Sequence, residues 1–261
     1  MRVLVPGTVQ YNHYRNMRLN QTVEYVRKQR KNWFKFDKGN FSIRQVFDLL
    51  EEFVDQSDPD LELPNKYHMF QAAEAARASG QPEWMILVSL IHDLGKIMCV
   101  WGSNSDGQGN QDQWGCVGDT FVVGCDLPEK LLAPELNAIN PDTLDSRFQG
   151  DGIYKRKCGL DNLMMAFGHD EYLYHVLSNH TDCRIPKQGL DAVRYHSCYA
   201  LHSSNAYDRF LVDSDNISLS TTKSLNRFDL YSKSDKTPDL EHLWPFYDDL
   251  ISKLCPGSLH W

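Results

Sequence analysis

The chain has 261 residues and a formal net charge of −8, from 27 Lys and Arg against 35 Asp and Glu. Hydrophobic residues make up 41% of it, which is enough to bury one sizeable core. The acidic balance argues against nucleic acid as the main partner. No apolar stretch approaches the roughly 20 residues that span a bilayer, so we expect no membrane partner.

Seven cysteines are scattered without a C-x-x-C pair, and no apolar leader precedes them. We therefore expect free thiols in a cytoplasmic protein. The chain has no internal repeat and no long linker, so we expect a single domain over residues 1–261, with residues 1–13 as a short N-terminal segment. We also expect a monomer.

Helical periodicity begins early in the chain. Residues 22–31 follow a helical pattern, and so do residues 42–56. The dense turn and acidic residues at 56–64 then predict a loop. The predicted buried face of the second helix is formed by Ile43, Val46, Phe47, Leu50 and Val54.

A helical hairpin comes next and carries the most informative residues. Residues 65–78 predict a helix with Asn65 as its N-cap. Gly80-Gln-Pro82 breaks that helix, and a proline suits the first turn of the next one. The next helix contains the apolar run 84–91, so we expect it to be buried on most of its surface. Into this helix the sequence places His92-Asp93.

The second half of the chain is less regular at first. Residues 102–116 are polar and rich in glycine, which predicts a mobile surface loop. Residues 117–124 are β-rich and bounded by glycines, which predicts a short β-hairpin or an ordered active-site loop. Helices resume near 161–177, 188–201, 222–231 and 240–254, and Pro256-Gly257 stops the last one. The predicted fold class is all-α, with at most a short β-hairpin.

The His92-Asp93 dipeptide lies in an apolar environment. An ionised carboxylate is strongly unfavourable in a protein interior unless it is paired or bound to a cation. A divalent metal would remove the penalty for both side chains, because neutral imidazole and carboxylate are common metal ligands. The alternative is a helix-end pair that caps backbone groups, and the dipeptide alone does not decide between the two.

Four further residues favour the metal interpretation. Each alone is more often a hydrogen-bonded core residue, a cap or an ion pair, but with His92 and Asp93 they exceed what one metal needs. We interpret Asp170 as a neighbouring or surface group. The four are His68, His169, His196 and Asp229, all on helix faces with apolar neighbours. The other histidines, expected at helix ends, on outer faces or at the terminus, are His13, His175, His180, His202, His242 and His260.

The metal motif leads to a family resemblance. His68, the His92-Asp93-Leu-Gly-Lys96 motif and Asp229 resemble the HD-domain superfamily, and the two extra histidines resemble its di-iron branch. Within that branch the chain resembles the myo-inositol oxygenase family over nearly its whole length. The segments that carry this resemblance are Gln21-Thr-Val-Glu24, Glu52–Asp60, Val117–Cys125, Phe167–Tyr172, Arg194–Ser197, Asn226–Tyr231 and Cys255-Pro-Gly257.

The resemblance implies an oxidoreductase that cleaves the ring of myo-inositol with dioxygen and gives D-glucuronate. Its cofactor would be a mixed-valent pair of iron ions in each chain. Six protein ligands fill only part of the coordination positions of two irons, as a catalytic site requires. The implied ligands are His68, His92 and Asp229 for one iron and His169 and His196 for the other, with Asp93 as the bridge.

The resemblance also implies which residues meet the substrate. Lys96 would act in catalysis, because it lies one helical turn after His92 and can place a cation beside a substrate oxygen that loses its proton. The implied substrate contacts supply donors and acceptors for an uncharged polyol. They are Tyr14, Asp55, Ser57, Asp58, Lys96, Gly118, Asp119, His196, Ser197 and Lys233.

Tyr14 matches an aromatic residue of the lid that covers the substrate in this family. An arginine of that lid has no counterpart at Arg2 or Arg15, so we expect looser closure and weaker substrate binding. A lid also keeps activated oxygen beside the substrate. Some dioxygen should therefore be consumed without glucuronate being formed.

Two other functions are compatible with the same ligands. A metal-dependent phosphohydrolase of the HD-domain superfamily needs a basic phosphate pocket, whereas Asp55, Asp58 and Asp119 would repel an anion. A non-catalytic member that keeps the fold as a binding module would not need all six ligands. Iron content together with dioxygen uptake on inositol separates the three functions.

Overall fold

A computed structural model describes residues 4–57, 64–231 and 237–261. The described chain is mostly helical, with one two-stranded sheet, and this confirms the predicted all-α class. The helices are α1 (Val9–Asn20), α2 (Val23–Trp33), α3 (Ile43–Leu49), α4 (Asn65–Ala78), α5 (Glu83–Ile91), α6 (Met98–Trp101), α7 (His169–Asn179), α8 (Lys187–Tyr195), α9 (Tyr199–His202), α10 (Asp215–Tyr231) and α11 (Leu240–Leu254). The strands are β1 (Asn40–Ser42) and β2 (Ser258–His260).

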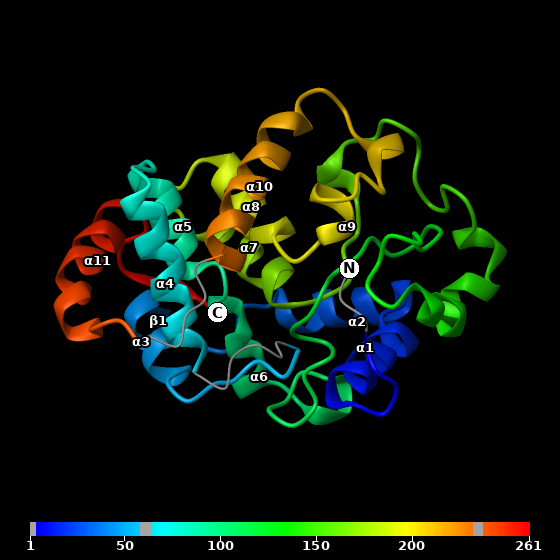
Figure 1. Ribbon diagram of the computed structural model, residues 1–261, viewed down its shortest axis with the longest axis horizontal. Coiled ribbons are helices and arrows are strands. Elements are labelled where there is room, and N and C mark those ends of the chain that lie inside the picture. Colours follow the sequence, from blue (N-terminus) through cyan, green and yellow to red (C-terminus); the bar gives the residue numbers. More distant parts are fainter. Residues whose placement is uncertain (1–3, 58–63, 232–236) are drawn as a thin grey trace.

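Five helices form the centre of the molecule. The α4–α5 hairpin packs against α10, and α10 packs against α8, which in turn contacts α7. Figure 1 shows α10, α8 and α7 in the middle, with α11 and α3 toward one end and α1 and α2 toward the other. Because the ends of α4, α5, α7, α8 and α10 converge, side chains far apart in the sequence meet at one point.

The stretch from Glu83 to Trp101 has the length and composition of a membrane span, but 83% of its most apolar 18-residue window is buried inside the protein. It is therefore a core element. The helix is interrupted after Ile91, and residues 94–97 form a 3₁₀ turn before α6. Gly95 allows this turn to approach α7, since a Cβ there would lie 2.0 Å from the carbonyl oxygen of His169.

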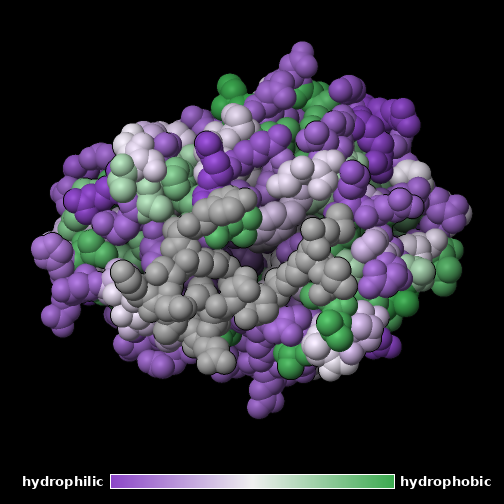
Figure 2. All heavy atoms as spheres, viewed as in Figure 1, coloured by the Kyte–Doolittle hydropathy of each residue, from purple (hydrophilic) through white to green (hydrophobic). Residues whose placement is uncertain are grey.

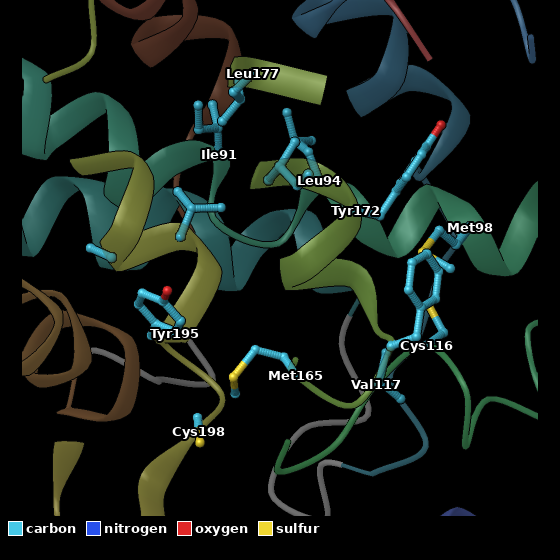
Figure 3. Close-up of a cluster of buried hydrophobic side chains, with 14 of the residues drawn as sticks. Ile91, Leu94, Met98, Cys116, Val117, Met165, Tyr172, Leu177, Tyr195 and Cys198 are labelled. Atoms are coloured by element: carbon cyan, nitrogen blue, oxygen red, sulfur yellow. The ribbon is translucent and has the colours of Figure 1, made fainter. Parts of the chain in front are cut away.

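The apolar cluster next to this turn draws on distant parts of the chain. Figure 3 shows Leu94 and Ile91 beside Tyr172 and Leu177 of α7, with Met165 nearer to Tyr195. All six are buried, at 1% exposure or less. The outer surface is different, because hydrophilic residues cover most of the face in Figure 2 and apolar ones are scattered among them. The seven cysteines are free thiols, as expected.

Several predicted helix boundaries in the first 65 residues are wrong. The first segment contains α1, which the sequence reasoning missed although Thr8 caps it by accepting from the backbone N–H of Tyr11. The predicted helix 42–56 ends at Leu49, so Val54 is 38% exposed and not on a buried face. Asn65 is the first residue of α4 and not its N-cap, which is Pro64.

The region from 117 to 168 is irregular with short 3₁₀ turns, and residues 117–124 do not form the predicted hairpin. Its only described pairing is an isolated bridge between Val122 and Met165. This pairing keeps residues 163–168 out of a helix, so α7 begins at His169 and not near 161. The alternative prediction, an ordered loop at the site, is correct for Gly118 and Asp119, which line the central cavity.

The one described sheet was not predicted. β1 and β2 pair antiparallel, with Phe41 opposite Leu259, and the indole of Trp261 donates to the carbonyl oxygen of Phe41. The polar loop 102–116 is only partly on the surface, because Gln108 and Gln113 are 2% exposed. Gln108 accepts from the indole N–H of Trp33. The mobility of this loop stays a prediction.

The last predicted helices differ from the structure at their ends. The segment 188–201 is divided into α8 and α9, and α10 begins earlier than expected, at Asp215. The polar side chains in the first half of α10 form hydrogen bonds within the protein. Ser218 donates to Asp191, and Thr222 donates to the carbonyl oxygen of Ser218. The prediction for 240–254 is confirmed by α11.

Candidate metal centre

All six predicted metal ligands lie together in the interior. Each is supplied by or next to a helix of the central group, and none is more than 7% exposed. They are His68 on α4, His92 and Asp93 directly after α5, His169 at the start of α7, His196 directly after α8, and Asp229 near the end of α10.

The first group of possible ligands consists of His68, His92 and Asp229, whose ligand atoms lie within 4.8 Å of one another. The Nε2 atom of His68 lies 2.8 Å from Oδ1 of Asp229. The Nε2 atom of His92 lies 3.5 Å from the same oxygen. Two imidazole nitrogens therefore converge on one carboxylate oxygen, which is a spacing that a single cation can use.

The second group is centred on Asp93 and includes His92 and His196. Oδ1 of Asp93 lies 3.2 Å from Nε2 of His169 and 3.6 Å from Nε2 of His196. Oδ2 of Asp93 lies 3.5 Å from Nε2 of His92. The two oxygens of Asp93 thus face different imidazoles, and Asp93 lies between the two groups.

Backbone carbonyl groups orient three of the four imidazoles. The Nδ1 atoms of His92, His169 and His196 lie 2.7 to 2.9 Å from the carbonyl oxygens of Ser89, Cys116 and Val193, respectively. A carbonyl can only accept, so each Nδ1 donates its proton there, and the Nε2 of the neutral imidazole is the nitrogen left to bind a metal. Nε2 of His92 is buried with no hydrogen-bond partner among the described residues. An orphaned lone pair of this kind fits a metal ligand.

The carboxylates of the centre are held in their ionised form. Burial alone would raise the pKa of Asp93, but Lys96 and the surrounding imidazoles outweigh it and hold that pKa well below its usual range. Burial opposes ionisation of Asp229 as well, and the neighbouring imidazoles of His68 and His92 keep its pKa low. The centre therefore offers two anionic carboxylates and four imidazole side chains, a donor set that suits a borderline divalent metal.

Lys96 connects the metal groups to the cavity. Its ammonium lies 2.8 Å from Oδ2 of Asp93 and 2.8 Å from Oδ2 of Asp55. Burial would lower the pKa of Lys96, but these two carboxylates raise it above its ordinary value. The same interactions outweigh the burial of Asp55 and lower its pKa to about 2. Ser57 donates to Asp55 from its hydroxyl and its backbone N–H.

Asn65 belongs to this network, and the sequence reasoning missed its role. Its amide donates to Oδ2 of Asp93 at 3.1 Å, and its carbonyl oxygen accepts from Lys96 at 3.1 Å. Asn65 lies one helical turn before His68, so the same face of α4 presents both to the centre. The three-residue spacing between Asn65 and His68 was the sequence signal that could have identified Asn65 as part of the site.

A cavity of about 510 Å³ adjoins the centre. Tyr14 and Asp119 meet at its wall, with the hydroxyl of Tyr14 3.2 Å from Oδ1 of Asp119. The predicted substrate contacts that line the cavity are Tyr14, Asp55, Ser57, Lys96, Gly118, Asp119, His196 and Ser197. The lining residues that sequence reasoning did not single out include Asn65, Lys130, Leu131, Leu132, Tyr199 and Leu230.

Some predicted residues cannot be placed or lie elsewhere. Asp58 and Lys233, predicted to bind substrate, lie outside the described residues, and so does Arg2. Arg15 is exposed and does not line the cavity. The expected looser lid stays a prediction.

Of the remaining histidines, His13 contradicts the expectation because it is buried inside α1, whereas His202 lies at the end of α9 as expected. His13 is 6% exposed and its Nε2 lies 3.1 Å from the carbonyl oxygen of Val117. His202 is fully buried, and its Nε2 lies 2.9 Å from the carbonyl oxygen of His196. Asp170 is also fully buried and accepts from the hydroxyl of Thr120. Asp170 is therefore a neighbouring group of the centre, the first of its two predicted alternatives, and all three side chains contact segments around the centre.

Comparisons with known proteins agree over nearly the whole chain. The profile of a family described as "Myo-inositol oxygenase" matches residues 8–261. A protein named inositol oxygenase from Danio rerio is 39% identical over 96% of this chain and 88% of its own length. The one from Mus musculus is 38% identical over 96% and 86%. Inositol oxygenase 1 from Arabidopsis thaliana is 40% identical over 95% and 78%.

Proposed function

The chain belongs to the myo-inositol oxygenase family, and from this premise we propose that its buried centre holds two iron ions beside a cavity that binds myo-inositol. It is an inositol oxygenase, an oxidoreductase. The proposal assigns the parts of that activity to residues of this chain. The single observation that carries it is the convergence of four imidazoles and two carboxylates next to a cavity of about 510 Å³.

The reaction joins one myo-inositol and one dioxygen and gives one D-glucuronate and one water. One carbon–carbon bond of the ring is broken, one oxygen atom enters the product, and the other leaves as water. Four electrons pass from the substrate to dioxygen, so no other reductant is needed. The iron ions, when bound, supply the redox chemistry and a Lewis acid for substrate and dioxygen.

Six side chains are proposed to hold the metals. Their support is the grouping of nitrogen and oxygen atoms around Asp229 on one side and Asp93 on the other. Asp93 is the proposed bridge, because its two oxygens face different imidazoles. The first iron would be held by His68, His92 and Asp229, and the second by His169 and His196, with Asp93 shared.

The cavity wall is proposed to bind and orient the polyol. Lys96 is the proposed catalytic residue, because its ammonium lines the cavity while it contacts Asp93. It would favour loss of a proton from a substrate hydroxyl by stabilising the negative oxygen. Asp55 and Asp119 would accept hydrogen bonds from other hydroxyl groups, and Ser197 would donate or accept.

The charge of the cavity disfavours a phosphohydrolase. Its described lining contains four carboxylates, from Asp55, Asp93, Asp119 and Asp229, and two ammonium groups. One of these, Lys96, is already engaged by two of the carboxylates. With Asp93 and Asp229 facing the metals, Asp55 and Asp119 are the carboxylates that would repel a phosphate monoester, whereas an uncharged polyol would donate hydrogen bonds to both. A non-catalytic role is disfavoured by the retained ligands and the open cavity beside them.

The test measures metal and turnover on the same preparation. We expect about two irons per chain by elemental analysis, and one glucuronate for each dioxygen consumed when myo-inositol is present. A generic phosphate monoester assayed in parallel should give no phosphate release. Protein with iron that releases phosphate and forms no glucuronate would contradict the proposal in favour of hydrolysis, and protein without bound metal would favour a binding module.

A further inference from the structure

Part of the cavity wall is formed by a loop that none of the sequence motifs includes. Lys130, Leu131 and Leu132 line the cavity together. Leu131 is 3% exposed, whereas Lys130 is exposed. The loop thus has a buried apolar anchor next to a charged side chain at the cavity.

Two side chains fix the backbone of this loop from either end. On one side, Nη2 of Arg18 donates to the carbonyl oxygen of Leu132 at 2.9 Å. On the other, the amide of Asn137 donates to the carbonyl oxygen of Pro128 at 3.1 Å. The position of Lys130 is therefore defined although the loop has no regular secondary structure.

Arg18 is an unusual anchor because it is 1% exposed. Burial lowers the pKa of its guanidinium to about 10. The guanidinium lies 4.7 Å from the centre of the Phe121 ring, and two of its nitrogens have no partner among the described residues. Burying a charge in this way is unfavourable. This unfavourable burial of a charge occurs where Arg18 holds the loop beside the cavity.

Lys130 differs from the other charged residues of the cavity wall in its ion pairing. Lys96 is paired with Asp55 and Asp93, and Asp119 contacts Tyr14. Lys130 makes no ion pair with any residue in the described part of the chain. Among the described lining residues it is therefore the one cation whose donors are available to a ligand.

We propose that Lys130 is a substrate-binding and specificity residue, whose ammonium donates hydrogen bonds to inositol hydroxyl groups from the loop wall of the cavity. This inference rests on the proposed function. An ammonium has three donors and inositol hydroxyls are acceptors, so the pairing is chemically matched. A charge-assisted hydrogen bond is roughly twice as strong as a neutral one. Lys130 would thus retain the polyol in the cavity without touching the metal ligands.

The test is Lys130→Met, which keeps the unbranched side chain up to the ε position and removes its donors. We expect the KM for myo-inositol to rise about tenfold, as for loss of one charge-assisted hydrogen bond. The kcat at saturation should stay within about twofold, and iron content should not change. Lys155→Met is the matched control, because Lys155 is exposed and does not line the cavity. Its KM should equal that of the wild type.

A conservative variant separates binding from structure. Lys130→Arg keeps the charge and donors, so its KM should lie well below that of Lys130→Met. An unchanged KM in Lys130→Met overturns the inference, and so does a KM in Lys130→Arg as high as in Lys130→Met. If the wild type itself binds no iron or does not oxidise inositol, the proposed function has failed instead. A wild type that is active while Lys130→Met is unaffected removes only the role of Lys130.

Discussion

Two buried polar clusters share the helices α7 and α8, and they differ in how their charges are balanced. The first is an ion-pair cluster formed by Glu171, Arg194 and Arg30. The carboxylate of Glu171 is fully buried and lies 2.7 Å from Nε of Arg194 and 2.7 Å from Nη2 of Arg30. The acceptor capacity of the carboxylate is filled by protein donors, so this cluster needs no ligand.

The second cluster is the metal centre, two residues away on each helix. His169 lies on α7 and His196 follows α8. Here four imidazole nitrogens face two carboxylates, and Nε2 of His92 has no hydrogen-bond partner among the described residues. Buried polar groups are normally paired. The ion-pair cluster also has one unpartnered buried atom, Nε of Arg30, but that atom is a donor and cannot bind a metal. A cluster whose carboxylate is filled by protein donors is structural, whereas one that leaves an imidazole lone pair unmatched is arranged for a ligand.

The largest expected effect is that of Asp93→Ala, which removes the proposed bridge. Four buried imidazoles would lose the charge that organises them, so we expect loss of both irons, loss of all turnover and a lower melting temperature. Elemental analysis and the dioxygen assay measure this. Asp119→Asn is the control for iron content, which it should leave unchanged, since Asp119 lines the cavity but belongs to neither ligand group. Asp93→Ala protein that purifies with about two irons would disprove the bridging role.

The next prediction separates a substrate role from a metal role within the same cluster. Lys96 cannot ligate a metal while protonated, and Asp93 and Asp55 raise its pKa above the ordinary value. Lys96→Met should therefore keep its iron and its fold but lose turnover by at least about 100-fold, as for loss of a group that stabilises a negative oxygen. If iron is lost together with activity, Lys96 has a structural role.

For the ion-pair cluster we expect the opposite of the Asp93→Ala result, namely a loss of stability with the iron content unchanged. Glu171→Gln removes the charge that compensates Arg194 and Arg30 while keeping the side-chain shape. Breaking a buried pair in this way should lower the free energy of unfolding by about 3 kcal/mol or more. Iron content per folded chain should not change. Urea denaturation with elemental analysis tests this, and Lys253→Gln at an exposed ion pair should leave stability unchanged. A Glu171→Gln protein as stable as the wild type would mean that the cluster is not structural.

The contrast between the clusters also explains what the sequence could predict. The six residues of the candidate metal centre could be singled out because each carries a signal within its own helix, either apolar neighbours at helical spacing or the His92-Asp93 motif. The helix 240–254 was predicted for the same reason, because its periodicity is local. The function followed from a resemblance that combines many such local signals.

What the sequence did not predict depends on contacts between distant segments. The start of α7 at His169 follows from the bridge between Val122 and Met165, which no local pattern encodes. Asn65 has the features of a helix cap, and only the meeting of α4 with the end of α5 turns its side chain to Asp93. Lys130 lines the cavity because Arg18, far away in sequence, holds its loop.

The smallest expected effect is a pH dependence that belongs to the ion-pair cluster. Burial opposes ionisation of Glu171, but Arg194, His175 and Arg30 hold its pKa well below the ordinary 4.5. A depressed folded pKa gives stability that is present above the unfolded pKa and is lost as the pH falls through the folded pKa. The gap in stability between wild type and Glu171→Gln should therefore be constant from pH 7 to about pH 5 and narrow below about pH 4.5.

Urea denaturation of both iron-loaded proteins at each pH measures this gap. The carboxylates of the metal centre also titrate in acid, because the pKa values of Asp93 and Asp229 are lowered too. They are the same in both proteins, so their contribution cancels in the difference as long as iron content is equal. A gap that stays constant into strong acid, or widens there, would show that Glu171 is not held ionised by its arginines. The ion-pair cluster would then resemble the metal centre, because its own side chains would not balance its charges.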